Sequence, residues 1–114
     1  MFIINRNKRI TNWNVSNGNN FSSLFRECSS LTDIKGLENW NLSSGNDFSS
    51  MFYRCSSLSD IKGLQYWNVS NGNNFSYMLS ECSSLKDIKG LENWNVLMAI
   101  ILVICSLNVL HYQI

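Results

Sequence analysis

The sequence contains no proline and one histidine among its 114 residues, and only 15% of its side chains are charged. Globular proteins usually carry about 25% charged residues. With 9 basic and 8 acidic side chains and a net charge of +1, the composition provides no basic surface for nucleic acid or an anionic membrane. It therefore argues against polyanion binding. The length fits one domain or a piece of one.

Recognisable catalytic motifs are also lacking. The chain has no G-x-S-x-G motif, no phosphate-binding loop and no catalytic carboxylate pair, so nothing points to a reaction. Four Trp, six Phe and four Tyr supply more apolar surface than a disordered chain carries, and the lack of proline argues against a flexible linker. The sequence therefore predicts a chain that folds and does not catalyse.

A repeat of 27 residues organises the chain. The tryptophans are spaced by this interval, at Trp13, Trp40, Trp67 and Trp94. Phenylalanine, cysteine, leucine, isoleucine and glycine recur at the same interval, for example at Phe21, Phe48 and Phe75. So short a unit cannot bury its own apolar face, so successive units must stack and share a core, as in a solenoid.

Within a unit the spacing predicts one short helix and one short strand. The helix is indicated by apolar residues at i, i+3, i+4 and i+7, namely Phe48, Met51, Phe52 and Cys55. Residues suited to capping a helix start precede it in the three units, at Asn20, Asp47 and Asn74. The strand is indicated by Leu58, Ile61 and Leu64, followed by glycine- and asparagine-rich turns. The predicted fold class is an α/β repeat solenoid of 27-residue units, each with a short strand and a short helix.

The repeated unit also carries a family signature. W-N-V-S-N is followed by a Phe- and Met-rich segment and then by C-S-S-L-x-D-I-x-G-L-x-x-W, over residues 11–96. This pattern resembles the BspA-like bacterial surface-protein repeat, a lipoprotein-associated domain of unknown function that is grouped with leucine-rich repeats. The resemblance implies a leucine-rich-repeat-like solenoid at the cell surface or outside the cell, which serves adhesion or ligand binding and has no enzymatic activity. Where the usual repeat has Val-Thr-Asn-Met after Ser-Asn, this chain has the segment 18–21, GNNF.

Both ends of the chain break the repeat. Residues 97–114 can be back-translated so that one restored base regroups the codons into SNGNNFSYMFFECSSLSD, which closely matches residues 70–87. Residues 1–13 regroup similarly into CSSLTEIKGLQNW. We therefore expect a frameshifted remnant of an upstream repeat at 1–10, the repeat array at 11–96, and an apolar tail at 97–114 that is a frameshifted repeat. The chain is then a fragment of a longer protein.

Membrane contact is expected only through parts of that longer protein. The apolar part of the tail is shorter than the roughly 20 residues that a membrane-spanning helix needs. The first nine residues place their charges after their apolar residues, which is the reverse of a signal peptide. No signal peptide is therefore predicted in this fragment.

Cysteine recurs at the repeat period, at Cys28, Cys55 and Cys82. No C-x-x-C pair accompanies these residues and His111 is the single imidazole, so we expect neither a metal site nor another cofactor. A Cys–His nucleophile pair would need His111, which lies in the apolar tail. We predict a buried column of thiols, because free cysteine packs as a small hydrophobic residue.

Asparagine recurs in N-x-S sequons at Asn14, Asn41, Asn68, Asn20 and Asn74. Such sequons carry glycans in secreted eukaryotic proteins. The alternative, which we favour, is that these side chains form turn, cap and ladder hydrogen bonds.

A repeated pair of charges provides the candidate binding face. Aspartate and lysine flank the isoleucine of every unit, at Asp33 and Lys35, Asp60 and Lys62, and Asp87 and Lys89. Side chains alternate along a strand, so the two charges of each pair should point outward together and form acidic and basic stripes. One interpretation is a solvated face with weak charge pairing. The other is a binding face, because repeat arrays use extended faces for their partners.

The leading functional hypothesis is a non-enzymatic, surface-exposed binding or adhesion module that engages a protein or glycan on a host or neighbouring cell. The runner-up is a structural spacer stalk with no ligand of its own. A column that varies on an otherwise uniform face would favour binding, because a stalk needs no variation there.

The reading-frame hypothesis predicts the nucleotide sequence. Accurate resequencing of the locus should restore repeat codons before Thr11 and after Val96, through one lost base at each break. An independently confirmed intact frame, whose codons for residues 97–114 do not regroup into repeat sequence, would disprove the hypothesis.

Overall fold

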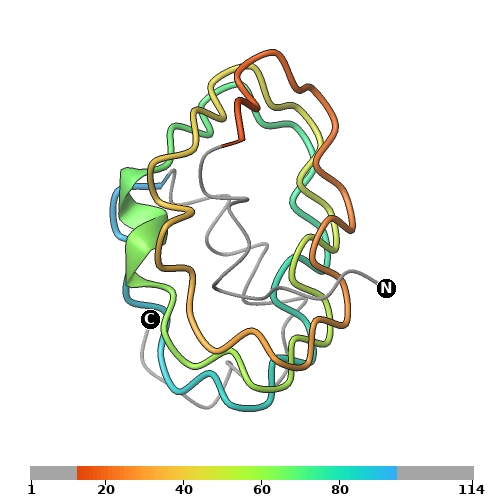
Figure 1. The fold of residues 1–114 in the computed structure, drawn as a ribbon, viewed down its shortest axis with the longest axis vertical. Helices are drawn as coiled ribbons and strands as arrows, with labels where there is room; N and C mark the ends of the chain where they lie inside the picture. The colour runs from red at the N-terminus through yellow and green to blue at the C-terminus, as the bar shows by residue number, and fades with distance from the viewer. Residues whose placement is uncertain (1–12, 95–114) are drawn as a thin grey trace.

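Three consecutive 27-residue units, at residues 14–40, 41–67 and 68–94, wind one behind another around a shared interior and follow nearly the same path (Figure 1). This arrangement comes from a computed structural model that describes residues 13–94. The predicted segments at 1–10 and 97–114 lie outside the described residues, and the division into three segments stays a prediction. Among residues 13–94, no helix reaches the length and apolar character that crossing a membrane requires.

Alternate backbone N–H groups join each unit to the next. The Phe21 N–H donates to the Asp47 carbonyl at 2.7 Å, and the Phe48 N–H donates to the Asn74 carbonyl at 2.8 Å. The donors in the first two units are Phe21, Ser23, Phe25 and Glu27, then Phe48, Ser50, Phe52 and Arg54. The intervening N–H groups form tight turns within their own unit, such as Tyr53 N–H to the Ser50 carbonyl at 3.1 Å. Along residues 21–27 and 48–54, the N–H groups thus alternate between bonds to the next unit and bonds within their own unit.

The prediction of an α/β, leucine-rich-repeat-like solenoid is wrong. The described residues contain no α-helix and no strand longer than a single bridge. Their regular structure consists of one 3₁₀ helix, η2, at Lys62–Tyr66, and of isolated parallel bridges at Asn20–Asp47, Asp47–Asn74 and Asp33–Asp60. The chain forms instead a compact body of mostly irregular backbone, with principal extents of 35 × 29 × 20 Å.

The predicted helix at residues 48–55 fails for a local reason. Ser50 and Arg54 have φ angles of 56° and 58°, which a right-handed helix does not admit. Every second N–H of the segment donates instead to a carbonyl of the next unit, so it is not available for hydrogen bonds within a helix. Asp47 still accepts the Ser49 N–H at 2.9 Å, but it closes a turn and caps no helix. The predicted strand at 58–64 is reduced to one bridge, because η2 occupies its second half.

Columns of apolar side chains fill the interior as the repeat predicts. Phe21, Phe48 and Phe75 stack with ring centroids 5.7 and 5.3 Å apart and nearly parallel planes. Stacked rings add about 0.5–1.5 kcal/mol to the stabilisation that burial alone gives. Trp40 and Trp67 are each 4% exposed, so these two members of the repeated tryptophan column belong to the shared core.

The tryptophans also tie neighbouring units together through their polar edge. The indole N–H of Trp67 donates to the Leu37 carbonyl at 2.8 Å, and that of Trp94 donates to the Leu64 carbonyl at 3.0 Å. A buried indole needs such a partner, because an unpaired buried donor costs about 1–3 kcal/mol. Each ring therefore both fills the core and satisfies a carbonyl of the preceding unit.

The predicted column of buried thiols is confirmed. Cys28, Cys55 and Cys82 are free and buried, and the Cys55 and Cys82 thiols donate to the carbonyls of Phe25 and Phe52 at 3.0 and 3.1 Å. Burial raises the pKa of Cys55 and of Cys82 from 9.0 to about 12. The neutral thiol is therefore the form that the folded core holds, and it is a poor nucleophile.

We predict that Trp67→Ala lowers the free energy of unfolding by about 3–5 kcal/mol, because it removes a large buried ring and its hydrogen bond. The neighbouring Tyr66→Ala is the control, since Tyr66 is 69% exposed and its loss should change the free energy by less than about 0.5 kcal/mol. Chemical denaturation of both variants measures the difference. Superimposable curves for Trp67→Ala and the parent would remove Trp67 from the core.

We also predict that Cys28, Cys55 and Cys82 are alkylated slowly in the folded chain at pH 9 and rapidly in denaturant. The pKa values of Cys55 and Cys82 are higher in the folded chain, at about 12, than the unfolded value of 9.0. The contribution of these thiols to the stability of the fold is therefore fully present below pH 9 and is lost as the pH rises toward about 12. Iodoacetamide labelling read by mass spectrometry, in a Cys105→Ser background, measures both rates. Equal rates with and without denaturant would contradict the burial of the thiols.

Candidate functional site

The six predicted face residues lie at equivalent positions of three successive units. The first two units meet here through the parallel bridge between Asp33 and Asp60. The lysines Lys35, Lys62 and Lys89 are exposed, whereas Asp33 and Asp60 are half-buried and Asp87 is exposed. In the first two pairs the aspartate and the lysine thus differ in exposure, whereas a simple alternating strand would expose both equally.

Each aspartate shapes the turn that carries its lysine. A carboxylate oxygen of Asp33 accepts the backbone N–H of Lys35 at 2.9 Å, and Asp60 accepts that of Lys62 at the same distance. Asp87 repeats the contact with Lys89 at 3.0 Å. Such a bond to the N–H two residues ahead forms a turn that is typical of aspartate and asparagine. The aspartates therefore hold the backbone as well as presenting charge.

The predicted asparagine turns are present beside them. The side-chain carbonyls of Asn14, Asn41 and Asn68 accept both the N–H and the hydroxyl of the serine two residues ahead, at 2.6–3.1 Å. The structural interpretation of the sequons is thus confirmed for these three positions.

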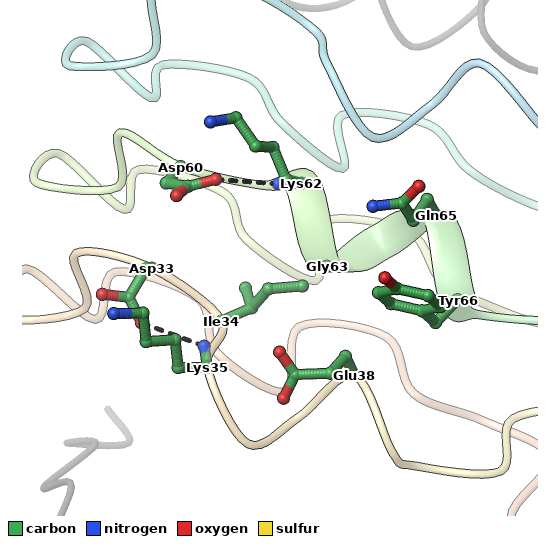
Figure 2. A pocket seen from close by; sticks show the side chains of 9 residues that line it. All are labelled: Asp33, Ile34, Lys35, Glu38, Asp60, Lys62, Gly63, Gln65 and Tyr66. Carbon is green, nitrogen blue, oxygen red and sulfur yellow. Dashed lines mark hydrogen bonds between the residues drawn. The ribbon is translucent and has the colours of Figure 1, made fainter.

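Four of the six face residues surround one hollow of about 200 Å³, which we call the Tyr66 hollow. Figure 2 shows that it opens between the first and second units. It is lined by Asp33, Ile34, Lys35 and Glu38 of the first unit and by Asp60, Lys62, Gly63, Gln65 and Tyr66 of the second. Asp87 and Lys89 are not among its lining residues, so the structure brings together two of the three predicted pairs.

Sequence reasoning missed three of the polar or aromatic residues of this hollow. Glu38, Gln65 and Tyr66 were not singled out, although the column of Tyr66 breaks the repeat. The equivalent residues are Asn39 and Asn93, while Tyr66 is 69% exposed. A column that changes on an otherwise uniform surface was the signal available in the sequence.

The residue before this column controls the adjacent glycine turn. A carboxylate oxygen of Glu92 accepts the Gly90 N–H at 2.6 Å, and Glu38 accepts the Gly36 N–H in the same way. Gly36 and Gly90 have φ angles of 89° and 114°, which suit glycine alone. Hydrogen bonds from the N–H groups of Glu92 itself and of Gly90 lower the pKa of the Glu92 carboxyl. The second unit has Gln65 at this position and forms η2 instead.

A second charged cluster is satisfied within itself. Arg54 lies between Glu27 and Glu81, with nitrogen–oxygen distances of 3.6 and 3.1 Å, and the Tyr53 hydroxyl donates to Glu81 at 3.0 Å. The hydrogen bonds from Tyr53 and then Arg54 lower the pKa of Glu81. Because these groups pair with one another at the surface, the cluster is a weaker candidate for binding than the Tyr66 hollow.

The described carboxylates and thiols do not gather into a metal site. Within residues 13–94, no group of three or more His, Cys, Asp or Glu side chains is placed to hold a metal ion. The expectation of no metal and no cofactor for the whole chain stays a prediction.

Comparison with known proteins places the chain in a family. Neither the curated proteins nor the solved structures give a match. Residues 1–101, which are most of the chain, match the family described as Mycoplasma protein of unknown function, DUF285. The chain therefore belongs to the DUF285 family of Mycoplasma proteins of unknown function.

Proposed function

We propose that this chain is a non-catalytic binding module that acts at the cell surface or outside the cell and engages a protein or glycan of a host or neighbouring cell. The observation that carries the proposal is the coincidence of two independent results. The repeat alone predicts the aspartate–lysine face, and four of its six residues line the Tyr66 hollow. The resemblance of residues 11–96 to the BspA-like surface-protein repeat also supports it.

The chemistry of the hollow favours binding over catalysis. Asp33 and Asp60 each hold a backbone N–H, so both carboxylates serve the turns of adjacent units. The buried thiols are neutral, because burial raises the pKa of Cys55 and Cys82 to about 12. A nucleophile needs a lowered pKa or an adjacent base, and neither thiol is placed with one.

The competing function is a spacer stalk. It requires only the stacked core and gives the exposed charges no role beyond solubility. The column at Tyr66 varies between units, with Asn39 and Asn93 at the equivalent positions, and this variation supports binding because a stalk needs none.

The test neutralises the predicted face in the 114-residue chain. The variant changes Asp33, Asp60 and Asp87 to Asn and Lys35, Lys62 and Lys89 to Gln. Asparagine keeps the oxygen that accepts the lysine N–H, so the turns should survive, as circular dichroism would show. We predict that binding to host matrix proteins or glycans falls about tenfold or more, which corresponds to about 1.4 kcal/mol.

A matched control neutralises Glu27, Arg54 and Glu81 to Gln. These charges pair with one another away from the proposed face, so this variant should keep the parent's affinity. Equal losses in both variants would indicate non-specific electrostatics. Failure of the parent chain to bind any surface ligand tested would favour the stalk.

A further inference from the structure

The Tyr66 hollow contains one feature that the repeated face does not. Tyr66 is the last residue of η2 and is 69% exposed, whereas the equivalent positions carry Asn39 and Asn93. A large aromatic side chain held by a short helix and left in solvent has unused apolar surface. This position is therefore the one in the hollow that a ligand would cover with the greatest gain.

Two adjacent units meet closely beneath this tyrosine. A Cβ atom on Gly63 would lie 2.9 Å from the terminal methyl of Ile34 and 3.3 Å from the Cβ of Glu38. The missing side chain of Gly63 thus allows the Glu38 segment to approach η2. Figure 2 shows Glu38 and Tyr66 on the same side of Gly63, with one residue from each unit bordering the hollow.

The charges around the hollow are arranged unevenly. Its lining includes the carboxylates Asp33, Glu38 and Asp60 and the ammonium groups Lys35 and Lys62. In Figure 2 the Lys62 side chain points away from Glu38 and Tyr66, and the Lys35 side chain extends toward Asp33. Glu38 and the tyrosine ring therefore border a space that neither ammonium group enters. A carboxylate beside an aromatic ring favours a cation.

The size of the hollow limits what can enter it, and the chemistry of its lining distinguishes between cations. Its volume is about 200 Å³, below the roughly 300–1,000 Å³ of sites that enclose a drug-sized molecule. The hollow therefore has room for about one side chain of a partner, while the rest of the ligand stays outside it. Among cationic side chains, the planar guanidinium of arginine both stacks on an aromatic face and pairs with a carboxylate through two hydrogen bonds, whereas lysine is a compact, strongly hydrated point charge.

We propose that the Tyr66 hollow binds an arginine side chain of a partner protein, with the guanidinium stacked on Tyr66 and paired with Glu38. This inference rests on the proposed binding function and names its ligand class. Asp33 and Asp60 add negative potential at the rim while they hold their turns.

The experiment titrates N-acetyl-arginine methylamide into the isotopically labelled 114-residue chain and follows amide chemical shifts by NMR. A single exposed contact of this kind should bind in the millimolar range, and the shifts should centre on residues 62–66 and on Glu38. The corresponding citrulline derivative has the same shape without the charge. We expect it to bind at least about tenfold more weakly, and high salt should weaken arginine binding.

Four variants locate the site. Tyr66→Ala and Glu38→Gln should each weaken arginine binding at least about fivefold. Because the second unit has Gln65 at this position and forms η2 there, the amide spectrum of Glu38→Gln must also show that the turn at Gly36 is retained. Glu92→Gln is the matched control beside Asn93, and Tyr77→Ala removes another exposed tyrosine. Both controls should leave arginine binding unchanged.

Several outcomes would overturn the inference. These are equal binding of arginine and citrulline, unchanged binding in Tyr66→Ala, an equal loss in the control variants, or tighter binding of methyl glycosides at the same residues. The chain can fail to bind arginine and still bind a surface ligand that is lost when the aspartate–lysine face is neutralised. That result would reject arginine as the ligand and keep the proposed function. A chain that binds neither arginine nor a surface ligand would reject both this inference and the proposed function.

Discussion

The hydrogen bonds between consecutive units are the constraint on which the rest of the structure depends. Every second N–H of the segment from Phe21 to Glu27 donates to the following unit, and the segment from Phe48 to Arg54 does the same. Left-handed backbone at Ser23, Glu27, Ser50 and Arg54 accompanies this pattern and places a tight turn after each of these residues. Residues with a side chain pay about 1 kcal/mol or more for that conformation. The inter-unit hydrogen bonds and the ring stacking offset this cost, and both exist only when the units are in register.

The same register explains which predictions from the sequence succeeded. Columns of identical apolar residues follow directly from a fixed period, so the burial of Trp67, the stacking of Phe48 on Phe75 and the buried thiols could all be predicted. The helix could not be predicted correctly. Apolar residues at i, i+3, i+4 and i+7 also suit a chain of tight turns, and the spacing does not reveal which carbonyl each N–H selects. Left-handed serine and arginine have no signature in the sequence.

The residues of the candidate site also fall into those that a fixed period reveals and those that it does not. The aspartates and lysines were found because they repeat, whereas Tyr66 and Glu38 were missed because they matter only as neighbours from different units. Their proximity depends on how closely the Glu38 segment approaches η2, and that distance is set by the contact between Gly63 and Ile34. A period identifies what is common to the units and exposes the varied column at Tyr66, but it does not show which residue of the neighbouring unit lies beside that tyrosine.

That difference has a local origin in the residue before the varied column. In the first and third units a glutamate accepts the N–H of the glycine two residues earlier, and the glycine adopts a positive φ. A carboxylate is the stronger acceptor for such a bond. The second unit has an uncharged amide, Gln65, at this position, and its glycine lies instead within η2. The exposed Tyr66 is the next residue in the sequence. One change in side-chain charge thus accompanies both the short helix and the aromatic surface that it carries, so the hollow lies where the repeat is broken.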